Sequence, residues 1–98
     1  MQKKYFFLKL VPSRPDFAQT MSEEERKIMS EHSQYWTELM NKGLALLFGP
    51  VLDPGGTFGI GILIVDKEDQ AHELAAQDPA SKLNRYEINP LLAKVAGH

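Results

Sequence analysis

Residues 44–65 read LALLFGPVLDPGGTFGIGILIV, and this stretch decides the fold of the chain. It holds two apolar runs of the kind that form strands, separated by DPGG at residues 53–56, a turn in which glycine permits positive φ. Pro50 cannot donate to a sheet ladder, so the first strand lies at a sheet edge or bends there. The stretch therefore predicts two consecutive strands, at residues 44–52 and 57–65.

A long helix is predicted before these strands. Ser22 and Glu25 have the spacing of a capping box, in which the hydroxyl accepts from a first-turn amide and the carboxylate reaches back. The helix is expected to start there and to run to Lys42, because Gly43 can supply the left-handed closing position.

A strand, a helix and a final strand complete the pattern, at residues 4–11, 67–77 and 85–89. Asp66 is expected to cap this second helix, and Asp78-Pro79 to stop it. Pro90 is expected to end the last strand. The segment before the long helix, residues 12–21, is expected to be a loop, and residues 91–98 form a short tail.

The order of elements is β-α-β-β-α-β, which predicts an α+β, ferredoxin-like fold. Right-handed crossovers place both helices on one face of a four-stranded antiparallel sheet. The 98 residues are too few for two cores, so residues 1–98 are expected to form a single domain.

The sheet face without helices should alternate with polar residues if it met water, but it does not. In the third predicted strand one face carries Phe58, Ile60, Ile62 and Ile64, and the other carries Gly59, Gly61, Leu63 and Val65. A bare apolar face of this size is rare in monomers. We therefore expect a homodimer that forms by sheet-to-sheet contact.

Composition excludes several classes of function. The formal charge is −2 and the 11 basic residues are scattered, so no nucleic-acid partner is expected. The chain has no cysteine, which removes disulfides and thiolate metal sites and favours the cytoplasm. It has neither a signal-peptide pattern nor the run of about 20 apolar residues that crosses a membrane, so no membrane partner is expected. The histidines His32, His72 and His98 lie on separate segments, so no metal site and no cofactor are predicted.

The long helix carries a histidine in its apolar stripe. The stripe recurs at spacings of three and four and comprises Ile28, Met29, His32, Tyr35, Trp36, Leu39 and Met40. One interpretation is that His32 is a buried imidazole hydrogen-bonded within the core. The other is that it is a reactive group, since a buried histidine must satisfy two ring nitrogens where leucine would simply pack.

Asp53 is the second candidate. It follows the edge strand and either bonds its own turn or faces a site at that sheet edge, where Arg14 should also lie. His32 is ten residues past the helix cap, about 15 Å from this edge. Contact between His32 and Asp53 thus requires the strand to curl inward at Gly49-Pro50.

Several motifs together resemble the YciI-like, YCII-related proteins: EEERKIMSEHSQYW with the following Gly43, then FGPVLDPGGTFGIGIL, and the late DPA before a strand. The resemblance covers nearly the whole chain. It implies a domain that dimerises as an α+β barrel and an active site built on a histidine and an aspartate, which correspond to His32 and Asp53. The reaction of the family is largely unassigned.

Together these features predict a cofactor-independent enzyme acting on a small molecule, an isomerase, lyase or hydrolase. Asp53 would orient His32, which would act as an acid and base during isomerisation, elimination or hydrolysis. Arg14, Tyr35, Gly49 and Pro50 are the candidate ligand-binding residues, although Arg14 also fits a solvated loop arginine, and Trp36 is expected in the core. The alternative is a non-catalytic dimer that binds a small ligand or another partner.

Overall fold

A computed structural model describes residues 3–97. Residues 1–2 and 98, which the predicted single domain and its tail include, lie outside the described residues. The elements in chain order are β1 (Lys4–Val11), α1 (Phe17–Thr20), α2 (Glu23–Asn41), β2 (Ala45–Val51), β3 (Phe58–Val65), α3 (Glu68–Gln77), the 3-10 helix η1 (Pro79–Lys82) and β4 (Arg85–Leu91).

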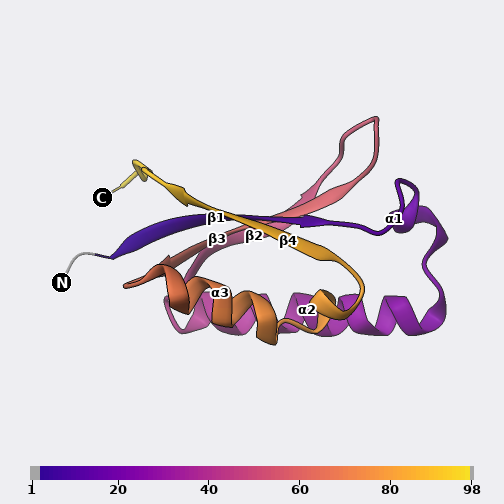
Figure 1. Ribbon diagram of the computed structural model, residues 1–98, viewed down its shortest axis with the longest axis horizontal. Coiled ribbons are helices and arrows are strands. Elements are labelled where there is room, and N and C mark those ends of the chain that lie inside the picture. Colours follow the sequence, from indigo (N-terminus) through magenta and orange to yellow (C-terminus); the bar gives the residue numbers. More distant parts are fainter. Residues whose placement is uncertain (1–2, 98) are drawn as a thin grey trace.

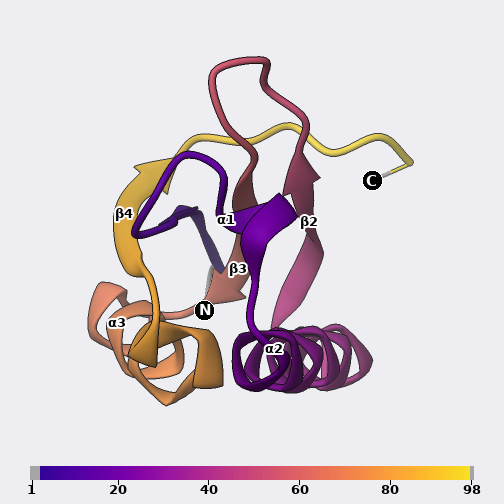
Figure 2. The same cartoon turned by 90° about the vertical axis from the view of Figure 1, so that its right-hand side faces the viewer.

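The four strands form one antiparallel sheet in the order β2-β3-β1-β4. α2 and α3 lie side by side on the same face of this sheet (Figures 1 and 2). The predicted ferredoxin-like α+β fold is therefore confirmed. β2 is an edge strand, as Pro50 indicated.

The predicted ends of the long helix are also confirmed. The Ser22 hydroxyl accepts from the Glu25 amide at 3.1 Å, and the Glu25 carboxylate accepts from the Ser22 amide at 2.9 Å. At the other end Gly43 has φ of 76°, a conformation that side chains with a Cβ rarely adopt.

Four details differ from the sequence-based expectation. The predicted loop at residues 12–21 contains α1, a single helical turn, and η1 adds another turn after α3. Asp66 does not cap α3, since Lys67 occupies the cap position and makes no side-chain cap bond. β4 continues through Pro90 to Leu91, because an edge strand tolerates a residue that cannot donate.

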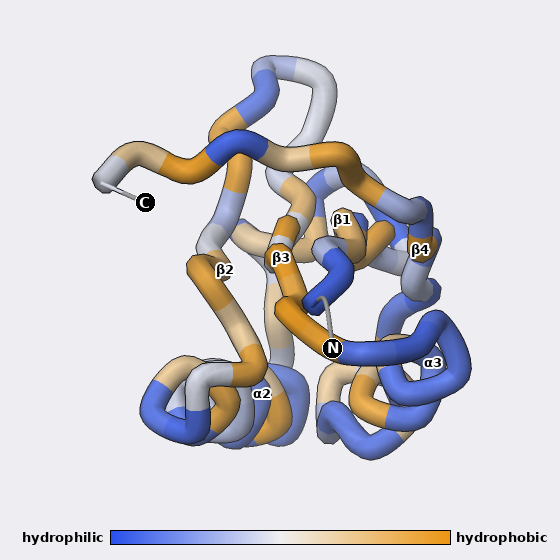
Figure 3. The backbone as a smooth tube through the Cα atoms, turned by 90° about the vertical axis from the view of Figure 1, so that its left-hand side faces the viewer, coloured by the Kyte–Doolittle hydropathy of each residue, from blue (hydrophilic) through white to orange (hydrophobic). Residues whose placement is uncertain are grey.

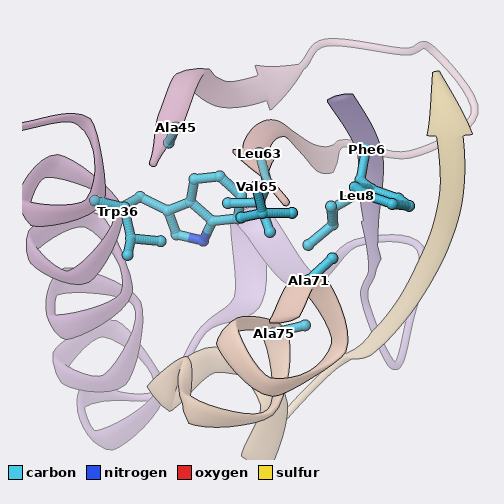
Figure 4. Packing of buried hydrophobic residues seen from close by; sticks show 9 residues of the cluster. Phe6, Leu8, Trp36, Ala45, Leu63, Val65, Ala71 and Ala75 are labelled. Atoms are coloured by element: carbon cyan, nitrogen blue, oxygen red, sulfur yellow. The ribbon is translucent and has the colours of Figure 1, made fainter. Parts of the chain in front are cut away.

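The core lies between the sheet and the two helices (Figure 4). Leu63 and Val65, which share one face of β3, point into it and are fully buried. A Cβ on Gly61 would overlap the indole ring of Trp36, so glycine leaves the space that this ring fills. Trp36 itself is 2% exposed, which confirms its predicted place in the core.

The face of the sheet away from the helices carries the second apolar set. Phe7 pairs with Ile62 across β1 and β3, and Leu47 of β2 pairs with Ile62 on the other side. Leu47 is 41% exposed, whereas Phe7 and Ile62 are half-buried within the single chain. Figure 3 shows the contrast with the helices, whose outer sides are largely hydrophilic.

No helix within residues 3–97 combines the length and apolarity needed to cross a membrane.

Candidate functional site

His32 forms a close pair with an aspartate on a distant part of the chain. Its Nδ1 lies 2.7 Å from Oδ2 of Asp78, at the junction of α3 and η1. The His32 side chain is 15% exposed and that of Asp78 is fully buried. α2 brings the histidine to the inner face of the helix layer, and the end of α3 brings the carboxylate beside it.

Asp78 is held by four donors from three elements of the fold, α2, η1 and β4. Its Oδ2 also accepts from Nε1 of Trp36 at 3.0 Å and from the hydroxyl of Tyr86 on β4. Its Oδ1 accepts from the amide of Ala80 at 2.9 Å, which caps η1. Every oxygen of this buried carboxylate is thus satisfied, which is what burial of an anion requires.

Opposing effects act on the pKa of Asp78. Burial raises this pKa, but hydrogen bonds from His32, Tyr86 and the Ala80 amide outweigh burial and hold it below its ordinary value. The same surroundings raise the pKa of Tyr86, first through burial and then through the charge of Asp78. At neutral pH the aspartate is therefore ionised, while Tyr86 remains a donor.

An ionised Asp78 decides the tautomer of His32. Nδ1 must carry a proton to donate to this carboxylate, so the neutral ring presents Nε2 as a hydrogen-bond acceptor. In the described residues no protein group bonds Nε2, and no side-chain nitrogen or oxygen there is both buried and unpaired. The second ring nitrogen is therefore accessible.

His32 lines a cavity of about 260 Å³ between α2, the sheet and the segment that contains α1. Most of the cavity wall is apolar, and its large apolar side chains are Leu10, Phe17, Met21, Met29, Phe48 and Phe58. The Phe48 ring meets the imidazole edge-on, with 6.2 Å between ring centroids. A small apolar ligand fits a cavity of this size and lining.

Only four side chains on the cavity wall carry polar atoms: His32, Ser33, Thr57 and Asn84. No lysine, arginine, aspartate or glutamate belongs to its lining, which is formed wholly by described residues. His32 is therefore the one titratable group that faces the cavity.

Two of the predicted ligand-binding residues, Gly49 and Pro50, line this cavity beside His32. Pro50 pairs with Gly59 across β2 and β3, and both residues belong to the cavity wall. Gly49-Pro50 thus lies at the site, but β2 stays paired through both residues to Val51, so the predicted bend is absent there and the strand does not bring Asp53 to the site.

Asp53 is exposed and bonds its own loop, where its Oδ1 accepts from the Gly55 amide at 2.7 Å. The loop between β2 and β3 projects away from α2 and α3, toward the bare side of the sheet (Figures 1 and 2). The inward curl that would have joined Asp53 to His32 is absent from the described chain, and Asp78 takes the position expected of Asp53. A part for Asp53 in catalysis stays a prediction.

Arg14 and Tyr35 also lie away from the cavity wall. The Arg14 guanidinium forms a two-pronged ion pair with Glu25, at 2.9 and 3.2 Å, and donates to the carbonyl of Thr20. The Tyr35 hydroxyl donates to the carbonyl of Leu74 on α3 at 2.6 Å. Both side chains therefore join elements of the fold, and ligand contact by either remains untested.

Sequence reasoning missed Asp78 and Asn84 as site residues. Asp78 was interpreted only as a helix stop, because an Asp-Pro pair has that meaning locally. The available signal was that a buried His32 needs a hydrogen-bond partner, and the aspartate of the DPA motif was a candidate for that partner. Asn84 carried no local signal, since asparagine before a strand is ordinary turn chemistry.

The described residues contain no group of three or more His, Asp or Glu side chains able to hold a metal ion. The arrangement can instead move a proton: an oriented imidazole, a buried counter-charge and an apolar cavity.

The fold and this site define a ferredoxin-like domain with a histidine-aspartate pair at an internal cavity. A sequence profile of the YCII-related domain matches residues 5–93, so the chain belongs to the YCII-related domain family. No curated protein matches the chain.

Two solved structures show the same fold. One is the 5-chloro-2-hydroxyhydroquinone dehydrochlorinase TftG from Burkholderia phenoliruptrix AC1100, in complex with 2,5-dihydroxybenzoquinone, with 22% identity and a TM-score of 0.63 over 86% of this chain and 90% of that one. The other is a variant of SnoaB, a cofactor-independent oxygenase from Streptomyces nogalater, with 10% identity and a TM-score of 0.53 over 100% of both chains.

Proposed function

We propose that the protein is a small-molecule enzyme in which His32 is the general base and Asp78 is its positioning residue. The observation that carries the proposal is the 2.7 Å contact between His32 Nδ1 and Asp78 Oδ2 in an imidazole that lines the cavity. This contact supports the proposal because it occupies Nδ1 and leaves Nε2, the basic nitrogen, without a partner among the described residues.

A single base of this kind can support three types of reaction. Nε2 takes a proton from the ligand, and the imidazolium that forms is stabilised by the adjacent carboxylate. Return of the proton to another atom completes an isomerisation, and departure of a leaving group completes an elimination. Removal of a proton from water gives hydrolysis. A positioned base of this kind typically accelerates a reaction by about 10² to 10⁴-fold and needs no cofactor.

One of the two comparisons names a reaction within this range, whereas oxygenation lies outside it. TftG is described as a dehydrochlorinase, which is an elimination, and SnoaB as an oxygenase that needs no cofactor. At such low identity they share a fold with this chain, and the choice of reaction has to come from its own site.

We further propose that the protein acts as a homodimer formed through the bare face of the sheet. Leu47, Phe7 and Ile62 form a continuous apolar patch there across three strands. Covering such a patch removes apolar area from water, which contributes about 25 cal/mol per Å² of buried area.

We also propose a cytoplasmic location, which the absence of cysteine favours.

A generic proton-abstraction probe tests the base. When a base removes the ring proton of 5-nitrobenzisoxazole from carbon, the N–O bond breaks and a coloured cyanonitrophenolate forms. We expect catalysis by the wild type and a loss of about 100-fold or more in His32→Gln, with thermal stability measured alongside. Ser33→Ala, at the next position on the same cavity wall, is the matched control and should keep most of the rate. Equal rates for wild type and His32→Gln would favour the alternative of a non-catalytic binding dimer.

A further inference from the structure

The side chain of Asn84 lies on the cavity wall and is held in one orientation. Its Nδ2 donates to the carbonyl of Ala80 at 3.2 Å and lies 3.7 Å from Sδ of Met29. Both neighbours are acceptors, so the amide nitrogen must face them and the amide oxygen must point elsewhere. Within the described residues Oδ1 has no partner, and it is not among buried unpaired atoms.

The turn that holds Asn84 is the turn that holds Asp78. The peptide units of Ala80 connect them, because its amide donates to the Asp78 carboxylate and its carbonyl accepts from both the backbone and the side-chain amide of Asn84. Ala80 is fully buried. The carboxylate that orients the base and the amide on the cavity wall are thus parts of one rigid segment.

Met29 relates the position of Asn84 to that of His32. This residue contacts Nδ2 of Asn84 and precedes His32 by three positions on α2, about 4.5 Å along the helix axis. His32 and Asn84 both line the cavity. The two side chains therefore bring two acceptors, Nε2 and Oδ1, to the lining of one cavity, and Asn84 also borders a second hollow beside Lys82 and Arg85.

We propose that Asn84 determines specificity, because its Oδ1 accepts a hydrogen bond from the ligand, and that the cavity selects small, uncharged apolar rings with two donor groups, such as neighbouring hydroxyls. One hydroxyl meets His32 Nε2 and the other meets Asn84. This inference rests on the proposed function for the first contact only. Since no acid or base other than His32 lines the cavity, a charged ring would lose its hydration without a partner.

Three fluorescent probes test the proposal: naphthalene-2,3-diol, 3-methoxy-2-naphthol and 2,3-dimethoxynaphthalene. Each methylation replaces a donor by an ether and leaves the ring unchanged. In wild-type protein, fluorescence titration should give about tenfold tighter binding of the diol than of the monomethyl ether, the usual effect of one lost hydrogen bond. Equal affinities, or no binding of the diol, would overturn the proposal without any variant.

Asn84→Leu, of similar size, assigns the effect to the residue. The diol should lose its advantage, to about twofold or less, while affinity for the dimethyl ether is unchanged. A tenfold preference that survives in a folded Asn84→Leu protein contradicts the proposal; Asn84→Ser, which is too short to reach, repeats the measurement should the first variant unfold. Asn41→Leu makes the same chemical change at an exposed position of α2 outside the cavity lining, and as the control it should keep the preference.

The two proposals fail separately. A diol preference that depends on Asn84, together with proton abstraction that does not depend on His32, would contradict the enzyme proposal and support the role of Asn84. Proton abstraction that depends on His32, together with a diol preference that does not depend on Asn84, would support the enzyme proposal and contradict the role of Asn84. His32→Gln should retain the dependence on Asn84, because the second hydroxyl is held by the other wall.

Discussion

Oδ2 of Asp78 lies 2.7 Å from Nδ1 of His32, although 46 positions separate the two residues in the chain. The contact joins the middle of α2 to the end of α3, and Trp36 and Tyr86 hold the same oxygen. A histidine in an apolar helix stripe thereby gains a fixed tautomer and one accessible nitrogen. This pairing is the basis of the first prediction.

Asp78→Asn should lower the rate of proton abstraction at least tenfold, because an amide cannot stabilise the imidazolium. Asp53→Asn is the matched control and should change it less than twofold, since Asp53 bonds only its own loop in the described chain. Rates at several pH values and ¹⁵N spectra of the His32 ring give the readout, and the spectra should lose the Nδ1–H tautomer only in Asp78→Asn. The opposite ranking of the two variants would return the role to Asp53.

Acid should weaken the fold through the pair formed by Arg14 and Glu25. The hydrogen bond from Arg14 is the main cause that lowers the pKa of Glu25 from 4.5 to about 2. A lowered folded-state pKa means that this contribution is present above pH 4.5 and is lost as the pH falls toward 2. Glu25→Gln should lower the melting temperature by a few degrees at pH 6 and by much less near pH 2. Glu24→Gln, in the same helical turn, should show the same dependence of melting temperature on pH as the wild type.

Gly61→Ala should destabilise the fold by about 1–3 kcal/mol, because the added Cβ overlaps the buried ring of Trp36. Gly49→Ala makes the same chemical change on the neighbouring strand, where a Cβ meets nothing within 4 Å, and should cost far less. Urea unfolding followed by tryptophan fluorescence compares them. Equal losses in the two variants would show that the Trp36 contact is not the cause.

Tyr35→Phe should cost about 1 kcal/mol of stability without altering ligand affinity, because the hydroxyl donates to the Leu74 carbonyl and not to the cavity. The pKa of Tyr35 is raised to about 12, chiefly by burial, so the group remains a donor at any pH used for assay. Unfolding curves and a naphthalene-2,3-diol titration on the same sample test both parts. A tenfold fall in affinity with unchanged stability would restore Tyr35 as a ligand-binding residue.

Ile62→Glu should convert the proposed homodimer to a monomer at micromolar concentration, since it places a charge in the centre of the bare apolar face. Light scattering after size exclusion measures the mass. Gln34→Glu, on the exposed side of α2, adds the same charge and should leave the dimer intact. A wild-type monomer under these conditions contradicts the proposed assembly.

Local patterns predicted most of the fold because each depends on neighbouring residues. The capping box at Ser22, the turn at residues 53–56 and the apolar run of β3 act over a few positions, and the order of the elements favours this sheet topology. The cap predicted at Asp66 was wrong, since several nearby residues can begin the same helix, and η1 was missed because one helical turn leaves little periodic signal.

The sequence by itself determined that His32 lies in the apolar stripe of α2 and that Gly49-Pro50 marks an edge strand beside the site. Only the tertiary structure decided which carboxylate serves the histidine. Asp53 and Asp78 both precede a proline and look alike locally, but the hairpin carries one to the open side of the sheet, while the helix layer buries the other. Burial, donors and distance arise from packing between remote segments, and these separate a turn residue from the partner of the histidine.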